Sequence, residues 1–503
     1  MAEKKQAGYN KKMQRQETRE CQECSYHKKC GGCEYSGIPY EEQLQKKEKR
    51  VARLLREFGK VEPIVGMSYP YYYRNKVHAV YAQKKNGQVI CGTYEKDSHR
   101  VVDIESCLLE DKQSTAIIRD IRGLLRSFKI KPYNEDTGYG LLRHVLVRHA
   151  HATGEVMVVL VIASPILPSK NNFVKALRQM HPEITTVVLN INGRNTSMVL
   201  GDQEKVLYGK GYIVDELLGM RFRISAKSFY QVNPIQTKHL YQGAISLAGL
   251  SGKERVLDAY CGTGTIGMIA SRDAKEVVGV ELNRDAVRDA ITNAKTNQAR
   301  NIRFVCEDAT EYICKAAANK EHFDVVLMDP PRAGSTKEFV DAVISLAPER
   351  VVYVSCNPET LARDLKWFCR AYRVETIRPY DMFPLTGHVE TVVLLSHKKP
   401  DGHINVKVEF GEGEGKVPLD NIAKRAEGYK PKERVTYKMI KEYIEAKYGF
   451  KVHTAYIAEV KRDLGLPMYD APNAVEELKQ PRKHPTPEKV EAIKDALKHF
   501  EVI

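Results

Sequence analysis

From residue 226 to residue 398, short apolar segments alternate with helical patterns, and this alternation constrains the fold more than any other feature of the chain. Each apolar segment is short and rich in valine, isoleucine and leucine, which is typical of buried strands. Repeats of strand, turn and helix build a mostly parallel sheet with helices on both faces. We therefore predict an α/β fold with a doubly wound sheet, whose strands are expected at 255–260, 276–282, 302–306, 323–329, 350–355, 372–378 and 389–396.

The regions on either side have other patterns. Residues 61–225 contain alternating or β-branched stretches and predict a β-rich α+β central domain. Residues 399–503 predict a C-terminal helical extension, in which helical patterns over 436–448 and 454–464 resemble a helix-turn-helix. The domain of the doubly wound sheet, 226–398, lies between them.

The first 60 residues divide into two parts. Residues 1–20 are polar and charged, and we predict a disordered basic arm. Residues 21–60 begin with a cysteine cluster and continue, over 40–58, with apolar residues at helical spacing. The basic residues expected to cover the rest of this helix are Lys46, Lys47, Lys49, Arg50, Arg53 and Arg56.

The charge of the chain favours a partner rich in phosphate. The formal net charge is +15 and the pI is about 9.1. No apolar run approaches the roughly 18 residues that a membrane span needs, and the first residues do not resemble a secretory signal. Eleven cysteines without such a signal favour metal binding, catalysis and buried thiols over disulfides. We expect a cytoplasmic monomer that does not bind membranes.

A glycine turn at 260–267 follows the first predicted strand of this sheet and predicts a cofactor site. Glycines allow a ligand to approach the backbone closely. Carboxylates follow at the ends of later strands: Glu281 suits ribose hydroxyls, Asp308 an adenine amino group, and Asp329 lies before two prolines. This arrangement resembles the S-adenosylmethionine methyltransferase fold. A nicotinamide-binding Rossmann domain is the alternative.

Cys356 ends the fifth strand of the pattern and is the candidate nucleophile. It lies just before a predicted helix, a position that favours thiolate over thiol. A thiolate that adds to carbon 6 of uracil makes carbon 5 nucleophilic, and a carboxylate must then remove the carbon-5 proton. Glu390 is the candidate base and His388 ranks second. A small buried thiol and a solvated strand-start carboxylate are the alternative readings of Cys356 and Glu390.

Four motifs in order resemble the RNA uracil-5-methyltransferase family, which modifies transfer RNA or large-subunit ribosomal RNA. They are Phe-Tyr-Gln-Val-Asn at 229–233, Asp-Pro-Pro-Arg at 329–332, Ser-Cys-Asn-Pro at 355–358 and His-Val-Glu-Thr at 388–391. The resemblance implies that Cys356 is the nucleophile and Glu390 the proton acceptor. It also implies that S-adenosylmethionine contacts Gln231, Tyr260, Thr265, Glu281, Asp308 and Asp329, although some members carry asparagine where this chain has Thr265.

Other functions fit these motifs less well. Amino-directed methyltransferases tend to carry tyrosine or phenylalanine where this chain has Arg332, and they need no cysteine. DNA cytosine enzymes usually place their cysteine after a proline, unlike Ser-Cys-Asn here. A non-catalytic RNA-binding or iron–sulfur sensing relative should have lost Cys356 or Glu390, and both are present.

The cysteine cluster allows two metal sites. By spacing, Cys21, Cys24, Cys30 and Cys33 could form a zinc knuckle, although the gap between the two pairs is short for a zinc ribbon. The run from Cys24 to Cys33 also resembles the family's iron–sulfur motif, whose fourth ligand is distant. That resemblance implies a 4Fe-4S cluster held by Cys24, Cys30, Cys33 and Cys107.

The expected RNA-binding parts are the central domain and the basic helix over 40–58. Arg74, Lys76, Arg143 and Arg148 lie on strand patterns and are candidates for phosphate contacts, with solvated strand faces as the alternative. The target uracil must be unpaired or flipped out of its helix. Ribosomal RNA is the favoured substrate and transfer RNA the alternative. The C-terminal extension is a further candidate for RNA binding.

Overall fold

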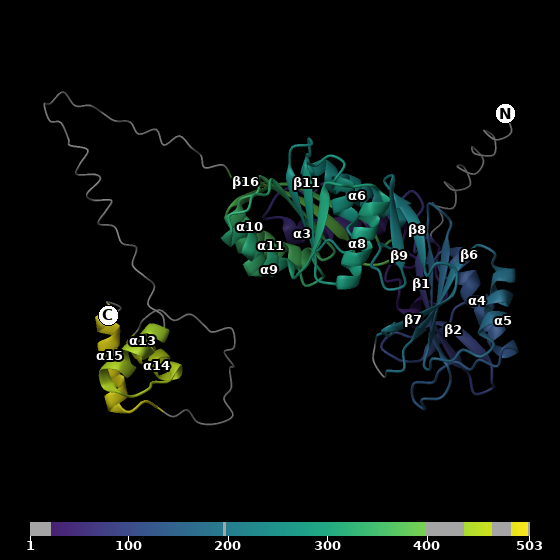
Figure 1. The fold of residues 1–503 in the computed structure, drawn as a ribbon, viewed down its shortest axis with the longest axis horizontal. Coiled ribbons are helices and arrows are strands. Elements are labelled where there is room, and N and C mark those ends of the chain that lie inside the picture. The colour runs from purple at the N-terminus through teal and green to yellow at the C-terminus, as the bar shows by residue number, and fades with distance from the viewer. Residues whose placement is uncertain (1–21, 195–197, 399–436, 465–483, 501–503) are drawn as a thin grey trace. The chain divides into compact units, whose positions relative to one another are not determined.

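The computed structural model describes residues 22–194, 198–398, 437–464 and 484–500. The chain divides into two compact units, residues 1–404 and 405–503, and each is described here by itself (Figure 1). The predicted arm over 1–20, Cys21 and residues 399–436 lie outside the described residues. No helix in the described ranges is long and apolar enough to cross a membrane.

The alternating pattern forms one seven-stranded sheet in the first unit. Its strand order is β12-β11-β10-β13-β14-β16-β15, and β16 pairs antiparallel with both of its neighbours, β14 and β15, while the other pairs are parallel. The strands are β10 (Arg255–Ala259), β11 (Glu276–Glu281), β12 (Ile302–Cys306), β13 (Val325–Met328), β14 (Arg350–Ser355), β15 (Tyr372–Tyr380) and β16 (Glu390–His397). All seven predicted strands are confirmed, as is the doubly wound α/β fold.

Helices cover both faces of this sheet. The helices on one face are α6 (Pro234–Ala248), α7 (Thr265–Ala270) and α8 (Arg284–Thr296), and they share an apolar core with Val256, Val277 and Val352. The helices on the other face are α9 (Ala309–Ala318), α10 (Lys337–Leu346) and α11 (Pro358–Phe368), and they pack on Leu257, Val326 and Val351. Strand residues thus alternate between two cores, as expected for a sheet that is covered on both sides.

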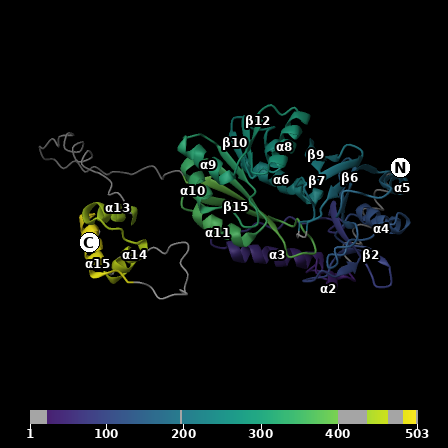
Figure 2. The same cartoon turned by 60° about the horizontal axis from the view of Figure 1, so that its bottom comes forward.

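Helix α3 (Tyr40–Leu55) belongs to the second of these layers. It lies beside α11, and its Val51 and Leu55 are fully buried in the same core (Figure 2). The predicted helix over 40–58 is confirmed in its main part. The expectation that its lysines and arginines all cover a free surface is wrong for Lys47, which is 1% exposed and paired with Asp381.

A second seven-stranded sheet forms the region before residue 210, with strand order β3-β2-β1-β4-β5-β6-β7. The strands are β1 (Lys76–Gln83), β2 (Val89–Tyr94), β3 (Val101–Asp103), β4 (Leu142–His149), β5 (Val156–Ile162), β6 (Ile184–Ile191) and β7 (Gln203–Tyr208). Only β5 and β6 pair in parallel. Helices α4 (Lys112–Ser127) and α5 (Lys170–Met180) pack on one face, which confirms the mixed α+β character.

A hairpin of β8 (Tyr212–Leu217) and β9 (Met220–Ser225) leads into the doubly wound sheet, and its apolar side chains join the core beneath α6. The short helix α2 (His27–Cys30) lies in the cysteine segment.

The second unit contains α13 (Tyr437–Tyr448), α14 (Thr454–Asp463) and α15 (Pro487–His499). The first two confirm the predicted pair of helices. The third closes a small core over Ile444, Ile457 and Ile493.

Candidate active site

The carboxyl edge of the doubly wound sheet gathers the predicted motifs. Strand β13 ends at Met328 just before Asp329, and β14 ends at Ser355 just before Cys356. Strand β16 runs the opposite way, so its first residue, Glu390, lies at this same edge. Ser355 pairs with Thr391, and one more step along the antiparallel register places Cys356 opposite Glu390. The fold therefore brings the two predicted catalytic side chains together.

Glu390 lies in an environment that favours its protonated form. Its side chain is buried, with 5% of the residue exposed. Burial and then the neighbouring Asp329 raise the pKa of Glu390 to about 8, and Arg332 acts in the opposite direction. Burial also raises the pKa of Asp329, to about 7. Both raised pKa values lie near neutral pH, which suits groups that exchange a proton with a substrate.

The electrostatics of Cys356 differ from the expectation. Its position before a helix was expected to favour the thiolate, but its pKa is raised to about 11. Burial is the largest cause, followed by Glu390 and Asp329, while Arg332 lowers the pKa. Burial, together with the adjacent Glu390 and Asp329, outweighs the helix terminus, because a negative charge removed from water beside other acidic groups is costly. Without a bound cation, Cys356 is therefore a neutral thiol.

The first turn of α11 fixes Cys356 relative to the Asp-Pro-Pro-Arg loop. The side chain of Asn357 caps α11 by accepting a hydrogen bond from the Glu359 N–H at 3.1 Å. Its Nδ2 donates to the Arg332 carbonyl at 3.3 Å, and the Thr360 hydroxyl donates to the same oxygen at 3.3 Å. Two of the motifs are thus joined by hydrogen bonds, which explains why these residue types occur together.

The glycine turn after β10 leaves an open space over its backbone. Gly262 has a φ of 56°, and a Cβ there would have no atom within 4 Å. At Gly264, with φ of 80°, a Cβ would come within 2.7 Å of the Phe304 ring. Tyr260 also has a positive φ, 63°, which is costly for a residue with a large side chain. The turn is therefore packed closely against Phe304 at Gly264 and has room for a ligand at Gly262.

The other predicted cofactor residues border this turn or its edge. Glu281 accepts hydrogen bonds from the N–H groups of Gly262 at 3.1 Å and Asn283 at 2.7 Å. Asp308 caps α9 through Thr310 N at 2.8 Å. Gln231 forms a hydrogen bond with Tyr241, whose pKa is raised by burial and then by the charge of Asp329.

Tyr260 and Thr265 face neighbouring hydroxyl groups. The hydroxyl of Tyr260 lies 3.2 Å from that of Ser335, and the hydroxyl of Thr265 lies 3.4 Å from that of Thr263. Thr265 is buried at the start of α7, with 9% exposed.

Asp258, which the sequence reasoning did not single out, is part of the same electrostatic cluster. It is 1% exposed and accepts a hydrogen bond from Gly267 N at 2.8 Å. Burial is the main cause that raises its pKa to about 8, and Asp329 and Glu281 add to the shift. The sequence feature that could have identified Asp258 is an aspartate inside an otherwise apolar strand. Asp329 adds to the raised pKa of both Asp258 and Glu390, so these buried carboxyl groups form a site suited to a cation.

His388, the rival base, is exposed. Partial burial and then Arg332 lower its pKa. Its ring lies 6.1 Å from that of Phe383, edge to face. The strand register favours Glu390 over His388, because only Glu390 lies opposite Cys356.

The cysteine segment converges with the loop at Cys107. Cys33 and Cys107 both pack in an apolar cluster with Tyr73 and Leu385. Burial, then Cys24 and Cys30, raise the pKa of Cys33 to about 12, and Cys33 contributes to the raised pKa of Cys107. In the described part of the chain, however, no group of three or more His, Cys, Asp or Glu side chains is arranged to hold a metal ion. Cys21, and with it the zinc-knuckle alternative, lies outside that part.

Two of the four predicted phosphate contacts are wrong. Arg143 and Arg148 are each 3% exposed. Arg143 donates to the carbonyls of Asn192 at 3.0 Å and Arg194 at 2.6 Å. Arg148 donates to those of Ala226 at 3.1 Å and Ser228 at 2.5 Å. Both guanidinium groups satisfy buried backbone oxygens rather than meet solvent.

Arg74 and Lys76 are half-buried. They alternate on β1 and its approach, and Asn75 N between them donates to Val232 O at 2.9 Å, in the segment that carries Gln231. The backbone between them therefore contacts the segment that carries Gln231.

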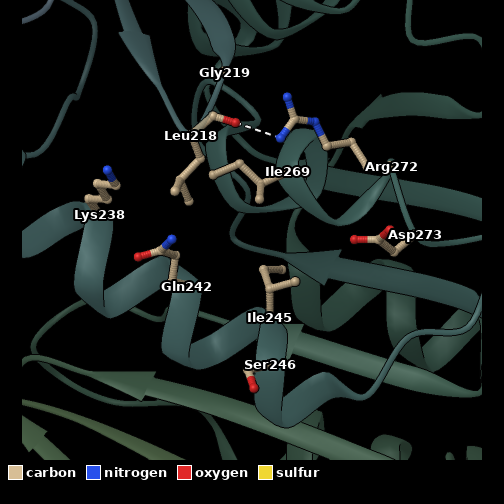
Figure 3. Close-up of a pocket in the computed structure, with 9 residues that line it drawn as sticks. All are labelled: Leu218, Gly219, Lys238, Gln242, Ile245, Ser246, Ile269, Arg272 and Asp273. Atoms are coloured by element: carbon tan, nitrogen blue, oxygen red, sulfur yellow. Dashed lines mark hydrogen bonds between the residues drawn. The ribbon is translucent and has the colours of Figure 1, made fainter.

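A pocket of about 640 Å³ lies elsewhere, between α6 and the turn of the β8–β9 hairpin (Figure 3). Arg272 borders it and donates to the Leu218 carbonyl at 2.6 Å, which fixes the hairpin turn. None of the predicted site residues lines this pocket.

The strand order, the glycine turn and the carboxylates at the strand ends define a class: this is a protein with the S-adenosylmethionine methyltransferase fold. The comparison with known families is more specific. The family described as tRNA (Uracil-5-)-methyltransferase matches residues 39–398, and the chain belongs to this family.

Several relatives cover most of the chain. An uncharacterized RNA methyltransferase of Halalkalibacterium halodurans is 40% identical over 381 residues, 75% of this chain and 83% of the relative. One from Clostridium acetobutylicum is 40% identical over 380 residues, 74% of this chain and 82% of the relative. Among solved structures, the Pyrococcus abyssi tRNA (uracil-54, C5)-methyltransferase in complex with S-adenosyl-L-homocysteine superposes with a TM-score of 0.62. It is 29% identical and covers 72% of this chain and 85% of its own.

Proposed function

We propose that this protein uses S-adenosylmethionine to methylate carbon 5 of a uracil in RNA, through a covalent adduct between Cys356 and carbon 6. The observation that carries the proposal is the placement of Cys356 opposite Glu390, with Asp329 and Arg332 beside both. A thiol and a carboxyl group at one strand edge are the two groups that this chemistry needs. Membership of the family supports the same reaction.

Cys356 performs the first part of the reaction. Its thiol loses a proton, and the sulfur forms a bond to carbon 6 of the ring, which leaves an enolate with a nucleophilic carbon 5. Because the pKa of Cys356 is about 11 in the free protein, positive charge at the site must favour the thiolate. Arg332, exposed at the end of the Asp-Pro-Pro-Arg loop, supplies part of that charge.

Glu390 performs the last part. After carbon 5 has gained its methyl group, the carboxylate removes the carbon-5 proton, and the carbon 6–sulfur bond breaks to release Cys356. Glu390 must be ionised at that moment. Its raised pKa makes it a stronger base than an exposed carboxylate once it has lost its proton.

The residues present fit the proposed cofactor. Bound S-adenosylmethionine supplies an electrophilic methyl group on a positively charged sulfur. Gly262 leaves room beside the backbone, and the carboxyl groups of Asp258, Glu281 and Asp329 can hold the negative charge that a cation needs, because a bound cation favours the ionised form of a carboxyl group. Gln231, Tyr260, Thr265 and Asp308 complete the proposed contacts. The Pyrococcus abyssi enzyme, whose structure contains S-adenosyl-L-homocysteine, supports this assignment.

The proposed substrate is structured RNA, with large-subunit ribosomal RNA first and transfer RNA as the alternative. The relatives are named as RNA methyltransferases, while the family name and the Pyrococcus abyssi enzyme refer to transfer RNA. Arg74 and Lys76 remain the proposed phosphate contacts of the central sheet, because both are half-buried beside the segment of Gln231.

We also propose a 4Fe-4S cluster on Cys24, Cys30, Cys33 and Cys107. The donor set supports it, because thiols from two separate segments meet beside Leu385. In the described part of the chain, these side chains as they stand do not form a metal-binding group. Purified protein should show broad visible absorbance that Cys107→Ser removes. Unchanged absorbance in that variant would exclude Cys107 as a ligand.

The main test offers unmodified transcripts of 23S ribosomal RNA and of transfer RNAs separately, with labelled S-adenosylmethionine. We expect 5-methyluridine in one of the two RNA classes, at one mapped position. Cys356→Ala should form no product, while Cys314→Ala, which removes an exposed thiol of α9, should match the wild type. Product from Cys356→Ala at the normal rate would refute the mechanism, and methylation at another atom would refute the reaction.

A further inference from the structure

The segment that leads into Glu390, residues 381–389, is held along its length by the N-terminal part of the chain. We name it the base loop, because it ends at the proposed base. Tyr35 N donates to Leu385 O at 3.0 Å, and the Tyr73 hydroxyl donates to Pro384 O at 3.0 Å. Both donors are more than 300 positions away in the sequence, so the base loop takes its shape from tertiary contacts.

Helix α3 provides a stripe of three polar side chains along this loop. Gln43, Lys47 and Arg50 have the spacing i, i+4 and i+7, which places them on one side of the helix. Gln43 accepts a hydrogen bond from Leu385 N at 2.9 Å. Lys47 Nζ donates to Asp381 Oδ1 at 2.5 Å and to Phe383 O at 3.0 Å.

The buried pair of Lys47 and Asp381 holds the start of the loop. Both side chains are 0% exposed. Burial lowers the pKa of Lys47, and the Asp381 carboxylate opposes that shift. Gln236 of α6 also donates to Asp381 O at 3.0 Å. A charge this deeply buried is retained only with its partners in place, so α3 and the loop must form together.

Arg50 lies at the other end of the stripe and contacts two catalytic segments at once. Its Nη1 donates to Gly387 O at 3.0 Å, three residues before Glu390. Its Nη2 lies 2.7 Å from Glu359 Oε1, three residues after Cys356. The planar guanidinium can direct two donors to different acceptors at fixed angles, which a lysine cannot do. Arg50 therefore bridges the nucleophile's helix and the base's loop.

We infer that Arg50 is a positioning residue that sets the separation between Cys356 and Glu390, so that one carboxylate can reach the carbon-5 proton of a ring bound to Cys356. This inference rests on the proposed function. The pair of Arg50 with Glu359 is partly exposed and contributes little to folding. Its effect should lie in geometry, because a displacement of about 1 Å between reacting groups can cost about 100-fold in rate.

The test compares Arg50→Ala and Arg50→Lys with Arg373→Ala, which removes an exposed arginine of β15. With the RNA that the wild type methylates, Arg50→Ala should lower kcat about 10- to 100-fold. Its KM for RNA should stay within about twofold, because the positioning takes place after binding. Arg50→Lys, which keeps one of the two contacts, should recover part of the rate, and Arg373→Ala should match the wild type.

Two further measurements distinguish a positioning role of Arg50 from a merely structural role. Proton removal should slow more than attack by Cys356, so denaturing gels should show more covalent protein–RNA adduct for Arg50→Ala than for the wild type. Its melting temperature should fall by no more than about 3 °C.

A kcat within twofold of the wild type, a rise in KM alone, or a loss of rate that only follows unfolding would each overturn the inference. A wild type that forms no 5-methyluridine would contradict both the proposed function and this inference. If the wild type forms 5-methyluridine and Arg50→Ala forms it at the same rate, only the role of Arg50 would be contradicted.

Discussion

The two seven-stranded sheets of the first unit carry polar residues in different ways. In the doubly wound sheet, the predicted site residues lie at one edge: Asp329 and Cys356 follow β13 and β14, and Glu390 begins β16. In the central sheet, Arg143 and Arg148 lie within β4 and bond backbone carbonyls in the interior. The position of a polar residue relative to the end of its strand, more than its charge, separates the two outcomes. A strand end opens to ligands, while a strand interior must satisfy its own polar groups.

The largest expected effect concerns the strand edge. Glu390→Gln should lower kcat about 10³-fold, because the amide cannot accept the carbon-5 proton. Attack by Cys356 needs no ionised Glu390, so the covalent adduct should accumulate on denaturing gels. His388→Gln is the control and should keep most of the activity. If His388→Gln were the variant that trapped the adduct, the base would be His388.

The next effect concerns the interior of the central sheet. Arg148→Leu should lower the free energy of unfolding by about 2–3 kcal/mol, because the carbonyls of Ala226 and Ser228 lose their buried donor. Denaturant titration measures this. The salt dependence of RNA binding should not change. If the variant had normal stability and a weaker salt dependence of RNA binding, Arg148 would be a phosphate contact. The difference between the two sheets would then not hold.

A smaller effect is expected from pH. Asp329, with a pKa of about 7, and Glu390, with a pKa of about 8, should each lose a proton when a cation binds nearby. The affinity for S-adenosylmethionine should therefore rise about 5- to 10-fold between pH 6 and pH 8.5. Calorimetry at several pH values measures this. S-adenosyl-L-homocysteine, which lacks the sulfonium charge, should show less dependence on pH, and equal behaviour of the two ligands would contradict the role of the carboxylates.

The sequence predicted the doubly wound sheet well because the pattern that specifies it is local. Strands such as β10, β14 and β16 are short apolar runs next to turns, and each can be located without its partners. The motifs lie at strand ends for the same reason, so the proposed site could be assembled in advance. The contribution of Asp258 could have been inferred, since an aspartate within an apolar strand needs a partner.

The rest depended on contacts between distant segments. Lys47 and Arg50 have the spacing of an exposed basic face. Only the fold shows that Lys47 contacts Asp381. The same holds for the contacts of Arg50 with Gly387 and Glu359. The raised pKa of Cys356 likewise results from burial and then from Glu390 and Asp329, which are close to it only in the folded chain. The prediction for Arg143 and Arg148 of β4 failed for the same reason, because strand propensity does not indicate whether an arginine side chain reaches solvent.

The smallest expected effect concerns the second unit. Deletion of residues 400–503 should leave kcat unchanged and weaken RNA binding only a few-fold, because the described part of that unit presents a modest number of basic residues, among them Lys451 and Arg462 at exposed positions. Binding measured across salt concentrations checks this. Identical affinity at every salt concentration would dismiss the unit as an RNA-binding module.

The most direct test of the central claim is to trap the bond between protein and RNA. With RNA that contains 5-fluorouridine, the carbon-5 substituent cannot leave as a proton, so the reaction should stop with the ring still bound to sulfur. Mass spectrometry of the digested complex should then find a methylated fluoropyrimidine nucleotide on the peptide that contains Cys356. A complex of the same yield from Cys356→Ala, or an adduct on any other residue, would contradict the account.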